Sequence, residues 1–542
     1  MSSHFRCAAL FFLLFGVAAL GQEGAQKPKL ATIEGLVTRI GTNEPMPDVR
    51  IAATPESGGA PRNATTNAQG KFTIADLPPG RYGLSASRTL FVRPRRDTGA
   101  LNVTLTPGQH LRDVVIHLAP TAVIAGRIVD SNGEPLRGVR VEAVRYQYRD
   151  GSRILTPAGQ AQSNDRGEYR IFNLPPGAYY VRASRPPNAF ESAPAFLYYP
   201  GVTDAQDAIP VTAASGAEAF ADFTVTPIAT FSVRLRITGA LTYSRPPSAQ
   251  FFVMRQALSV PEIVSFQAES LGDGAYRIPA LTPGRYEIFA RLRPSVDATP
   301  LVLQSGRIAI NIGDEDLDAG VVQVRPDAAV SGRFAAAAPL PAAVDPTKVS
   351  VVLRPMPGLP AALGASSRNA GGALTEDGAF TIPNVAPGRF RVDVSGLPPG
   401  VYLTSARHGG REVLDSGLTV EGDSQGTLEL LLGGPESVGA VEGVVRGRDN
   451  QPVPDCVVAV VPAPARRANP AAFKSTTTDQ SGLFSIRGLL PGEYTVLAWE
   501  DLEPGAHQDP EILKAFESRG VKVTVERGRL SVVDVRVVSF EL

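Results

Sequence analysis

A block of alternating aromatic and aliphatic residues recurs five times along the chain and limits the possible folds more than any other feature. In each copy a glycine is followed two positions later by an aromatic residue, then by isoleucine, an aliphatic residue, a Pro-Gly pair and a second aromatic. The first glycines of the five copies are about 100 residues apart: Gly70, Gly167, Gly274, Gly378 and Gly482. That period is typical of a whole domain, because a solenoid repeat spans only ~20–50 residues. The 542 residues are therefore predicted to form about five similar domains.

The repeated block has the chemistry of two β-strands joined by a turn. Phe72 and Ile74 lie two residues apart, so their side chains share one face of a strand. A Pro-Gly pair favours a turn, because proline fixes φ and glycine accepts positive φ. The aromatic that follows, Tyr82 in the first copy, is typical of the tyrosine corner of Greek-key sandwiches, in which the hydroxyl bonds to nearby backbone. Phe390 cannot make that bond in the fourth copy.

Further strands are predicted on both sides of the block. Four copies begin with an aliphatic residue, any residue and a glycine, and a glycine inside a strand marks a close approach of two backbones. These glycines are Gly35, Gly126, Gly332 and Gly443. In three copies a proline-led strand follows, in which Cys456 takes the position of Val49 and Val139; we expect it to be a small buried residue rather than a redox or metal group. Each copy is expected to end in a β-hairpin, such as 101–105 with 114–118.

These blocks together resemble the carboxypeptidase regulatory-like domain, most closely in the first, second and fifth copies. The resemblance implies a transthyretin-like sandwich of seven strands, a fold shared with certain carbohydrate-binding and adhesin modules, and no catalytic residue. We therefore expect an all-β tandem array of about five immunoglobulin-like β-sandwich domains, the third degenerate and the fifth with a helical insert. Units 1 to 5 are predicted at residues 30–119, 120–228, 229–327, 328–437 and 438–542.

The N-terminus has the pattern of an export signal. Arg6 precedes a short apolar stretch, and small residues at Ala19 and Gly21 favour cleavage before Gln22, so residues 1–21 are predicted to be a signal peptide. After cleavage Cys456 would be the only cysteine, which excludes an intrachain disulfide. No later stretch approaches ~20 apolar residues. We expect an exported bacterial protein, periplasmic, surface-associated or secreted, without a membrane span after cleavage.

Charge and motifs argue against catalysis, cofactors and nucleic acid. Lys+Arg and Asp+Glu both number 53, so no overall field would attract nucleic acid. No histidine has a glutamate three residues later, as a zinc carboxypeptidase requires. The letters of a nucleophile elbow at 422–426 fall in a predicted hairpin turn. Asp314, Asp316 and Asp318 have calcium-loop spacing, but Ala319 stands in place of the required glycine.

Two aromatic regions are candidate ligand sites. A helix is predicted from Asp509, as N-cap, to Gly520. Trp499 precedes it and would be either a plate packed beneath the helix or an exposed stacking residue. A second candidate is the loop with Phe196, Tyr198 and Tyr199. Aromatic faces suit sugars, although packing is their commoner use.

Two functions remain open. The first is a non-catalytic scaffold or protein-interaction rod of the cell envelope, since the short, proline-containing joints between units favour a semi-rigid rod. The alternative is a carbohydrate-binding protein for extracellular polysaccharide. The single tryptophan argues against it, because repeated sugar platforms would need more aromatic residues of this kind. Envelope proteins or polysaccharide are thus the expected partners, and the sequence leaves the oligomeric state open.

Overall fold

The computed structural model describes residues 29–93, 101–149, 151–184, 197–225, 229–239, 247–256, 262–266, 268–294, 302–336, 344–367, 375, 377–422 and 426–539. The predicted signal peptide and Phe196 lie outside them. This part of the chain is nearly all strand, and its one α-helix, α1 (Pro510–Phe516), lies in the predicted helical segment. The all-β prediction is confirmed.

Unit 1 is a sandwich of two four-stranded sheets, ordered β4-β1-β8-β6 and β3-β2-β5-β7. The first and last long strands, β1 and β8, pair in parallel. Its strands are β1 (Ala31–Arg39), β2 (Arg50–Pro55), β3 (Arg62–Thr65), β4 (Lys71–Leu77), β5 (Gly80–Ser87), β6 (Phe91–Val92), β7 (Leu101–Leu105) and β8 (His110–Pro120). The predicted closing hairpin is wrong, because β7 pairs with β5 while β8 pairs with β1 in the opposite sheet. Crossing between sheets lets β8 cover the edge of β1 and place Ile116 and Leu118 in the core.

Units 2 and 4 repeat this two-sheet plan with additions at the edges. Unit 2 contains β9 (Ala122–Asp130), β10 (Arg140–Arg149), β11 (Ser152–Gln162), β12 (Glu168–Leu174), β13 (Gly177–Ser184), β14 (Leu197–Tyr198), β15 (Val211–Ala213), β16 (Glu218–Phe220) and β17 (Phe223–Val225). Unit 4 contains β26 (Ala328–Ala336), β27 (Ser350–Pro355), β28 (Ala365–Ser366), β29 (Ala379–Val385), β30 (Gly388–Ser395), β31 (Tyr402–His408), β32 (Arg411–Glu412), β33 (Leu418–Val420) and β34 (Leu428–Gly433).

In units 3 and 5 the two sheets are joined along one side by a short ladder, through β24–β25 and β39–β41 respectively. Unit 3 contains β18 (Phe231–Gly239), β19 (Ser248–Arg255), β20 (Glu262–Phe266), β21 (Glu269–Gly272), β22 (Ala275–Leu281), β23 (Gly284–Arg293), β24 (Gln304–Ile312) and β25 (Leu317–Pro326). Unit 5 contains β35 (Gly439–Arg446), β36 (Val457–Pro462), β37 (Lys474–Thr477), β38 (Leu483–Leu489), β39 (Gly492–Trp499), β40 (Val521–Val525) and β41 (Leu530–Val538).

Short 3-10 turns accompany units 4 and 5. They are η2 (Ala361–Leu363), η4 (Pro435–Ser437), η5 (Pro464–Arg466), η6 (Pro470–Ala472), η7 (Ala506–Gln508) and η8 (Glu517–Arg519).

Each unit has its own hydrophobic core. The buried residues of the five largest clusters fall within 31–118, 122–223, 233–324, 328–430 and 441–535. The repeated block supplies the same positions each time, such as Phe72, Ile74 and Leu77 in unit 1. The chain is thus a tandem array of five sandwiches, and the exact limits of each unit stay a prediction.

Two repeated details have the predicted geometry. Four tyrosines donate from the hydroxyl to the carbonyl four residues earlier: Tyr82 to Pro78 (2.8 Å), Tyr179 to Pro175 (2.5 Å), Tyr286 to Thr282 (2.8 Å) and Tyr494 to Leu490 (2.7 Å). The opening glycines meet the neighbouring strand so closely that a Cβ at Gly35 would lie 2.3 Å from the Val114 carbonyl oxygen. Both predictions are confirmed.

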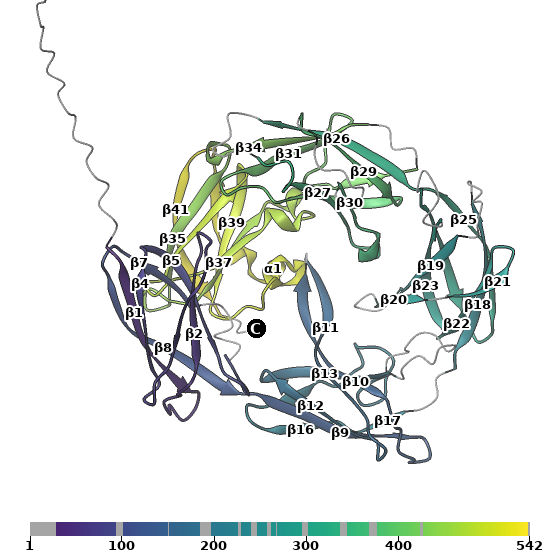
Figure 1. The fold of residues 1–542 in the computed structure, drawn as a ribbon, viewed down its shortest axis with the longest axis horizontal. Helices are drawn as coiled ribbons and strands as arrows, with labels where there is room; N and C mark the ends of the chain where they lie inside the picture. The colour runs from purple at the N-terminus through teal and green to yellow at the C-terminus, as the bar shows by residue number, and fades with distance from the viewer. Residues whose placement is uncertain are drawn as a thin grey trace, which may run out of the picture.

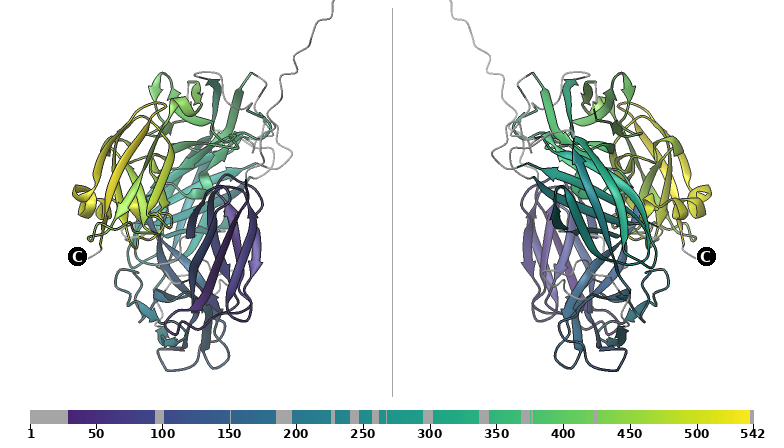
Figure 2. Two further views of the ribbon diagram at one scale, coloured as in Figure 1. Left: turned by 90° about the vertical axis from the view of Figure 1, so that its left-hand side faces the viewer. Right: turned by 90° about the vertical axis from the view of Figure 1, so that its right-hand side faces the viewer.

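The five units are arranged as a closed ring rather than a rod (Figure 1). Followed from purple to yellow, each unit turns the chain in the same sense, until unit 5 lies beside unit 1. The side views show that the ring is not flat, because unit 5 projects to one side (Figure 2). The expected rod is therefore wrong. Short joints restrict the angle between units, but its direction depends on the surfaces that meet at each junction.

Candidate functional sites at the junctions

Side-chain hydrogen bonds close the ring between unit 1 and unit 5. The Thr104 hydroxyl donates to Asp479 Oδ2 (2.8 Å), and the Gln480 side chain accepts from the Thr104 amide (3.1 Å) and donates to the Thr104 carbonyl (3.0 Å). Arg81 Nη2 donates to the Thr477 carbonyl (3.1 Å). Asp479 is also the residue whose Oδ1 accepts two amides within its own turn. The turn before β38 is therefore stabilised by its own hydrogen bonds and also forms hydrogen bonds with β7 of unit 1.

A second connection crosses the ring from unit 2 to unit 5. The β10–β11 hairpin extends to α1 (Figure 1), and Tyr148 packs against the cluster that contains Trp499. Gly505 has φ of +83°, and a Cβ there would lie 2.7 Å from the Tyr148 carbonyl oxygen. The insert of unit 5 thus packs against the β10–β11 hairpin of unit 2.

Trp499 lies beneath α1 and is fully buried. Its ring meets Phe516 edge to face, with centroids 6.4 Å apart, and Leu513 belongs to the same cluster. The helix begins as predicted, with Asp509 Oδ1 accepting from the Glu511 and Ile512 amides at 2.8 and 3.2 Å. This is the packed arrangement of the two that the sequence left open. The indole Nε1 has no hydrogen-bond partner among the described residues.

Gly520 follows the helical segment for a reason that the sequence did not reveal. Its φ is −80° rather than positive, so it is not a left-handed cap. A Cβ at Gly520 would lie 2.3 Å from Thr495 Cγ2. Close packing against β39 therefore requires the glycine.

The aromatic loop of unit 2 is mostly turned inward. Tyr198 is 1% exposed and packs with Val144 and Ala205, whereas Tyr199 is half-buried with its ring 5.8 Å from that of Phe223. Phe196 lies outside the described residues. The structure places these tyrosines in unit 2 and Trp499 in unit 5, so the candidates do not form one site. Ligand binding by them stays a prediction.

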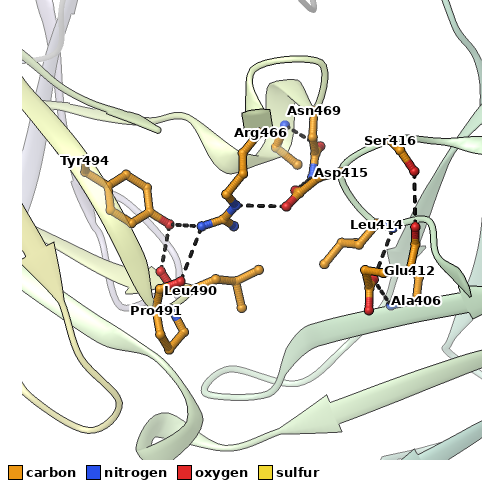
Figure 3. Close-up of polar contacts among 11 residues, drawn as sticks. Ala406, Glu412, Leu414, Asp415, Ser416, Arg466, Asn469, Leu490, Pro491 and Tyr494 are labelled. Atoms are coloured by element: carbon orange, nitrogen blue, oxygen red, sulfur yellow. Dashed lines mark hydrogen bonds and ion pairs between the residues drawn. The ribbon is translucent and has the colours of Figure 1, made fainter. Parts of the chain in front are cut away.

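The junction of units 4 and 5 is held by one carboxylate (Figure 3). Asp415 accepts from Arg466 Nε (2.8 Å) and Asn469 Nδ2 (2.9 Å), and Arg466 Nη1 donates to the Tyr494 hydroxyl (3.0 Å). Burial raises the pKa of Tyr494, and the Arg466 charge opposes the rise. Glu412 Oε1 accepts from the amide of Ala406 in β31 and from the amide of Leu414 in the loop that carries Asp415. The charges of Asp415 and Arg466 therefore stabilise the contact between units 4 and 5.

The junction of units 3 and 4 contains a cavity of about 440 Å³. Arg291 Nη2 donates to Asp327 Oδ2 (2.8 Å) and to the Asn384 carbonyl (2.7 Å), and Asn384 Oδ1 accepts from the Leu303 amide (2.9 Å). Burial raises the pKa of Asp327, although Arg291 opposes the rise. Asn384 has φ of +55° and lies in the bulge before the Pro-Gly turn. Sequence reasoning missed this bulge, although asparagine favours left-handed φ.

The residues weighed as catalytic or metal-binding candidates make contacts within the protein. His110 pairs with Glu34 at 3.0 Å rather than with Asp113, and Asp316 and Asp318 accept from backbone amides. Within the described part of the chain, histidine, cysteine and acidic side chains form no group of three that could hold a metal. The letters at 422–426 include residues 423–425, which lie outside it.

Cys456 has the predicted environment. It is fully buried, and burial raises the pKa of its thiol to about 12. Its amide donates to Thr478 Oγ1 (2.9 Å), as the amides of Val49 and Val139 donate to Thr66 and Ser163. The three positions are therefore equivalent in structure.

Comparison with known proteins finds a family similarity for part of the chain. Residues 32–119 and 123–196 match the model of the carboxypeptidase regulatory-like domain family. The BOS complex subunit NOMO1 of Mus musculus is 29% identical over 140 residues, which cover 26% of this chain and 10% of that protein. The serine-aspartate repeat-containing protein D of Staphylococcus aureus is 29% identical over 139 residues, 23% of this chain and 10% of that protein. This chain thus spans about a tenth of the curated relatives' length.

Among solved structures, similarity is found to bacterial pilins. A streptococcal ancillary pilin is 14% identical with a TM-score of 0.19, over 55% of this chain and 99% of the pilin. The minor pilin GBS52 of Streptococcus agalactiae is 19% identical with a TM-score of 0.24, over 37% of this chain and 97% of the pilin. In the described residues every helix is too short to cross a bilayer. The family match thus covers unit 1 and the first part of unit 2, which are similar to carboxypeptidase regulatory-like domains.

Proposed function

We propose that this protein is an exported, non-catalytic scaffold of the bacterial cell envelope, a ring of sandwiches that presents fixed surfaces to envelope proteins. The closure of the ring between Thr104 and Asp479 is the observation that carries the proposal. A rod of independent sandwiches would need no such contact. A closed ring fixes the distances between surfaces on different units.

The strength of the closure is consistent with a persistent ring. A partly exposed hydrogen bond contributes ~0.5–1.5 kcal/mol, and several act together at this junction. Both partners belong to one chain, so closure proceeds at an effective concentration in the millimolar range, as for other linked sites. The contact between Tyr148 and the cluster of Trp499 adds to it.

Small-angle scattering tests the ring. Thr104→Val removes the Thr104–Asp479 bond, and Gln480→Ala removes both bonds of the Gln480 side chain. Combined with Tyr148→Ala, these two changes should open the ring and increase the radius of gyration. Gln69→Ala, in the equivalent turn of unit 1, is the control, since the side chain of Gln69 is exposed. A wild-type radius equal to that of the triple variant would contradict a closed ring.

The cellular role needs a separate test. Fractionation and N-terminal sequencing should find the mature chain in the envelope, starting at Gln22. A photo-crosslinking residue at Phe220 or Val532, exposed at 68% and 72%, should give defined adducts with envelope proteins, and opening the ring should weaken them. An unprocessed cytoplasmic chain would refute the scaffold function. So would a yield of crosslinked adducts that does not change when the ring is opened.

Polysaccharide binding by aromatic stacking is the alternative. It has less support, because the rings of Trp499 and Tyr198 are buried. A glycan array with the mature protein tests it, with Tyr199→Ala as the informative variant, since Tyr199 is only half-buried.

A further inference from the structure

A groove at the junction of units 1 and 2 gathers arginines that are far apart in the sequence. The groove has a volume of about 1070 Å³, and Arg50, Arg88, Arg93 and Arg145 line it. Three of them come from unit 1 and Arg145 comes from β10 of unit 2. Asp48 is the one carboxylate among the described residues that line the groove. The groove is therefore strongly positive on a chain whose formal charge is zero.

These positive charges differ from those at the other junctions. Arg291 and Arg466 each lie 2.8 Å from a carboxylate oxygen, so their charge is neutralised within the protein. Arg50, Arg88 and Arg145 have no ion pair with any described carboxylate. Arg50 is exposed and the other two are half-buried, so all three can reach a ligand. Arg145 also has a side-chain hydrogen bond with Tyr179, which is uncharged and leaves the positive charge of the guanidinium in place. Arginines without a carboxylate partner attract anions.

The walls of the groove indicate the kind of anion. Phe91, Pro175 and Pro176 also line it, and such rigid apolar surfaces suit the faces of sugar rings. Phe91 is the one described aromatic residue of the lining, and the Arg88 guanidinium lies 5.3 Å from its ring centroid. Bases of single-stranded nucleic acid bind on successive aromatic platforms, which this lining does not provide.

Guanidinium groups pair with carboxylates through two parallel hydrogen bonds. Arginines from two units along an open groove fit repeated carboxylates better than a single small anion. We propose that this groove binds an acidic polysaccharide, whose uronate carboxylates pair with Arg50, Arg88 and Arg145. The proposal goes beyond the scaffold function and does not depend on it, because consecutive units form the groove and an opened ring would retain it.

The test is binding of polygalacturonate to the full-length mature protein, measured by calorimetry at low and physiological salt, with neutral dextran as reference. Arg50→Gln combined with Arg88→Gln should weaken binding at least tenfold. Arg234→Gln combined with Arg536→Gln removes the same charge from exposed positions on units 3 and 5, and should change affinity less than about twofold, because distant surface charges are screened. Unchanged circular dichroism and melting temperature would show that both double variants are folded.

A third variant has an effect of opposite sign. Asp48→Asn removes the negative charge from the groove, and asparagine tolerates the left-handed φ of +57° found there. It should strengthen binding of polygalacturonate. Three results would overturn the proposal: no preference of the wild type for polygalacturonate over dextran, equal losses in the two double variants, or tighter binding of polyphosphate or of single-stranded DNA than of polygalacturonate.

Discussion

Truncation of Trp499 to alanine should destabilise unit 5 without directly removing a ligand contact. The side chain is fully buried and meets Phe516 and Leu513. Replacement of such a residue by alanine removes its transfer free energy and leaves a cavity, at a cost of ~3–5 kcal/mol. Unit 5 should therefore unfold at a lower temperature while the other four units change little.

The phenylalanine variant separates packing from polarity. The buried indole Nε1 has no partner among the described residues, and a buried polar group without a hydrogen bond costs ~1–3 kcal/mol. Trp499→Phe removes that group and retains most of the apolar surface. We expect it to cost clearly less than Trp499→Ala.

The assay benefits from a chain with one tryptophan. Intrinsic fluorescence of the native wild type should be blue-shifted and poorly quenched by acrylamide, and both properties report on Trp499 alone. Calorimetry then gives the melting transition of each variant. An emission typical of exposed indole, or a Trp499→Ala variant with an unchanged melting profile and reduced glycan binding, would refute the packed arrangement.

Three further results are expected. Cys456→Val should cost less than ~1.5 kcal/mol of unfolding free energy, as a nearly volume-conserving core substitution. Thiol reagents should label Cys456 only when the protein unfolds, because burial raises the pKa of the thiol to about 12. Rapid labelling of the native protein would disprove burial. His507 is buried, and burial lowers its pKa to about 4. Between pH 6.5 and 4 the unfolded state therefore binds a proton that the native state does not bind, and the unfolding free energy of unit 5 should fall by about 2 kcal/mol from pH 7 to pH 5. Melting curves of His507→Gln should lack this loss, and a pH dependence identical to that of the wild type would contradict the prediction. Tyr82→Phe should cost ~0.5–1.5 kcal/mol for the lost corner hydrogen bond, measured by calorimetry of unit 1, and no change would mean that the hydroxyl is equally well solvated when unfolded.

The junctions suggest why unit 5 carries an insert. Tyr148 from unit 2 packs against the cluster beneath α1, and a Cβ at Gly505 would collide with the Tyr148 backbone. The sequence made this region a candidate ligand site. In the structure the insert packs against another unit of the same chain.

The repeated block by itself determined the strands, the turns and the cores. Spacing of two places Phe72 and Ile74 on one face, and a Pro-Gly pair ends one strand and starts the next. The helix from Asp509 and the burial of Cys456 follow from equally local rules. Such features depend on residues close in sequence, or on alignment of one copy with another, so they can be predicted from the chain alone.

Only the tertiary structure decided how the units meet. Asp415 with Arg466, Thr104 with Asp479, and the arginines of the groove join residues from different units, and the repeated pattern does not specify which surfaces touch. The short joints between units accordingly favoured a rod, and nothing in the repeated block indicated an anion site. The bend at each joint depends on a few contacts between nearly independent domains. The four bends between consecutive units together, rather than any single motif, close the ring.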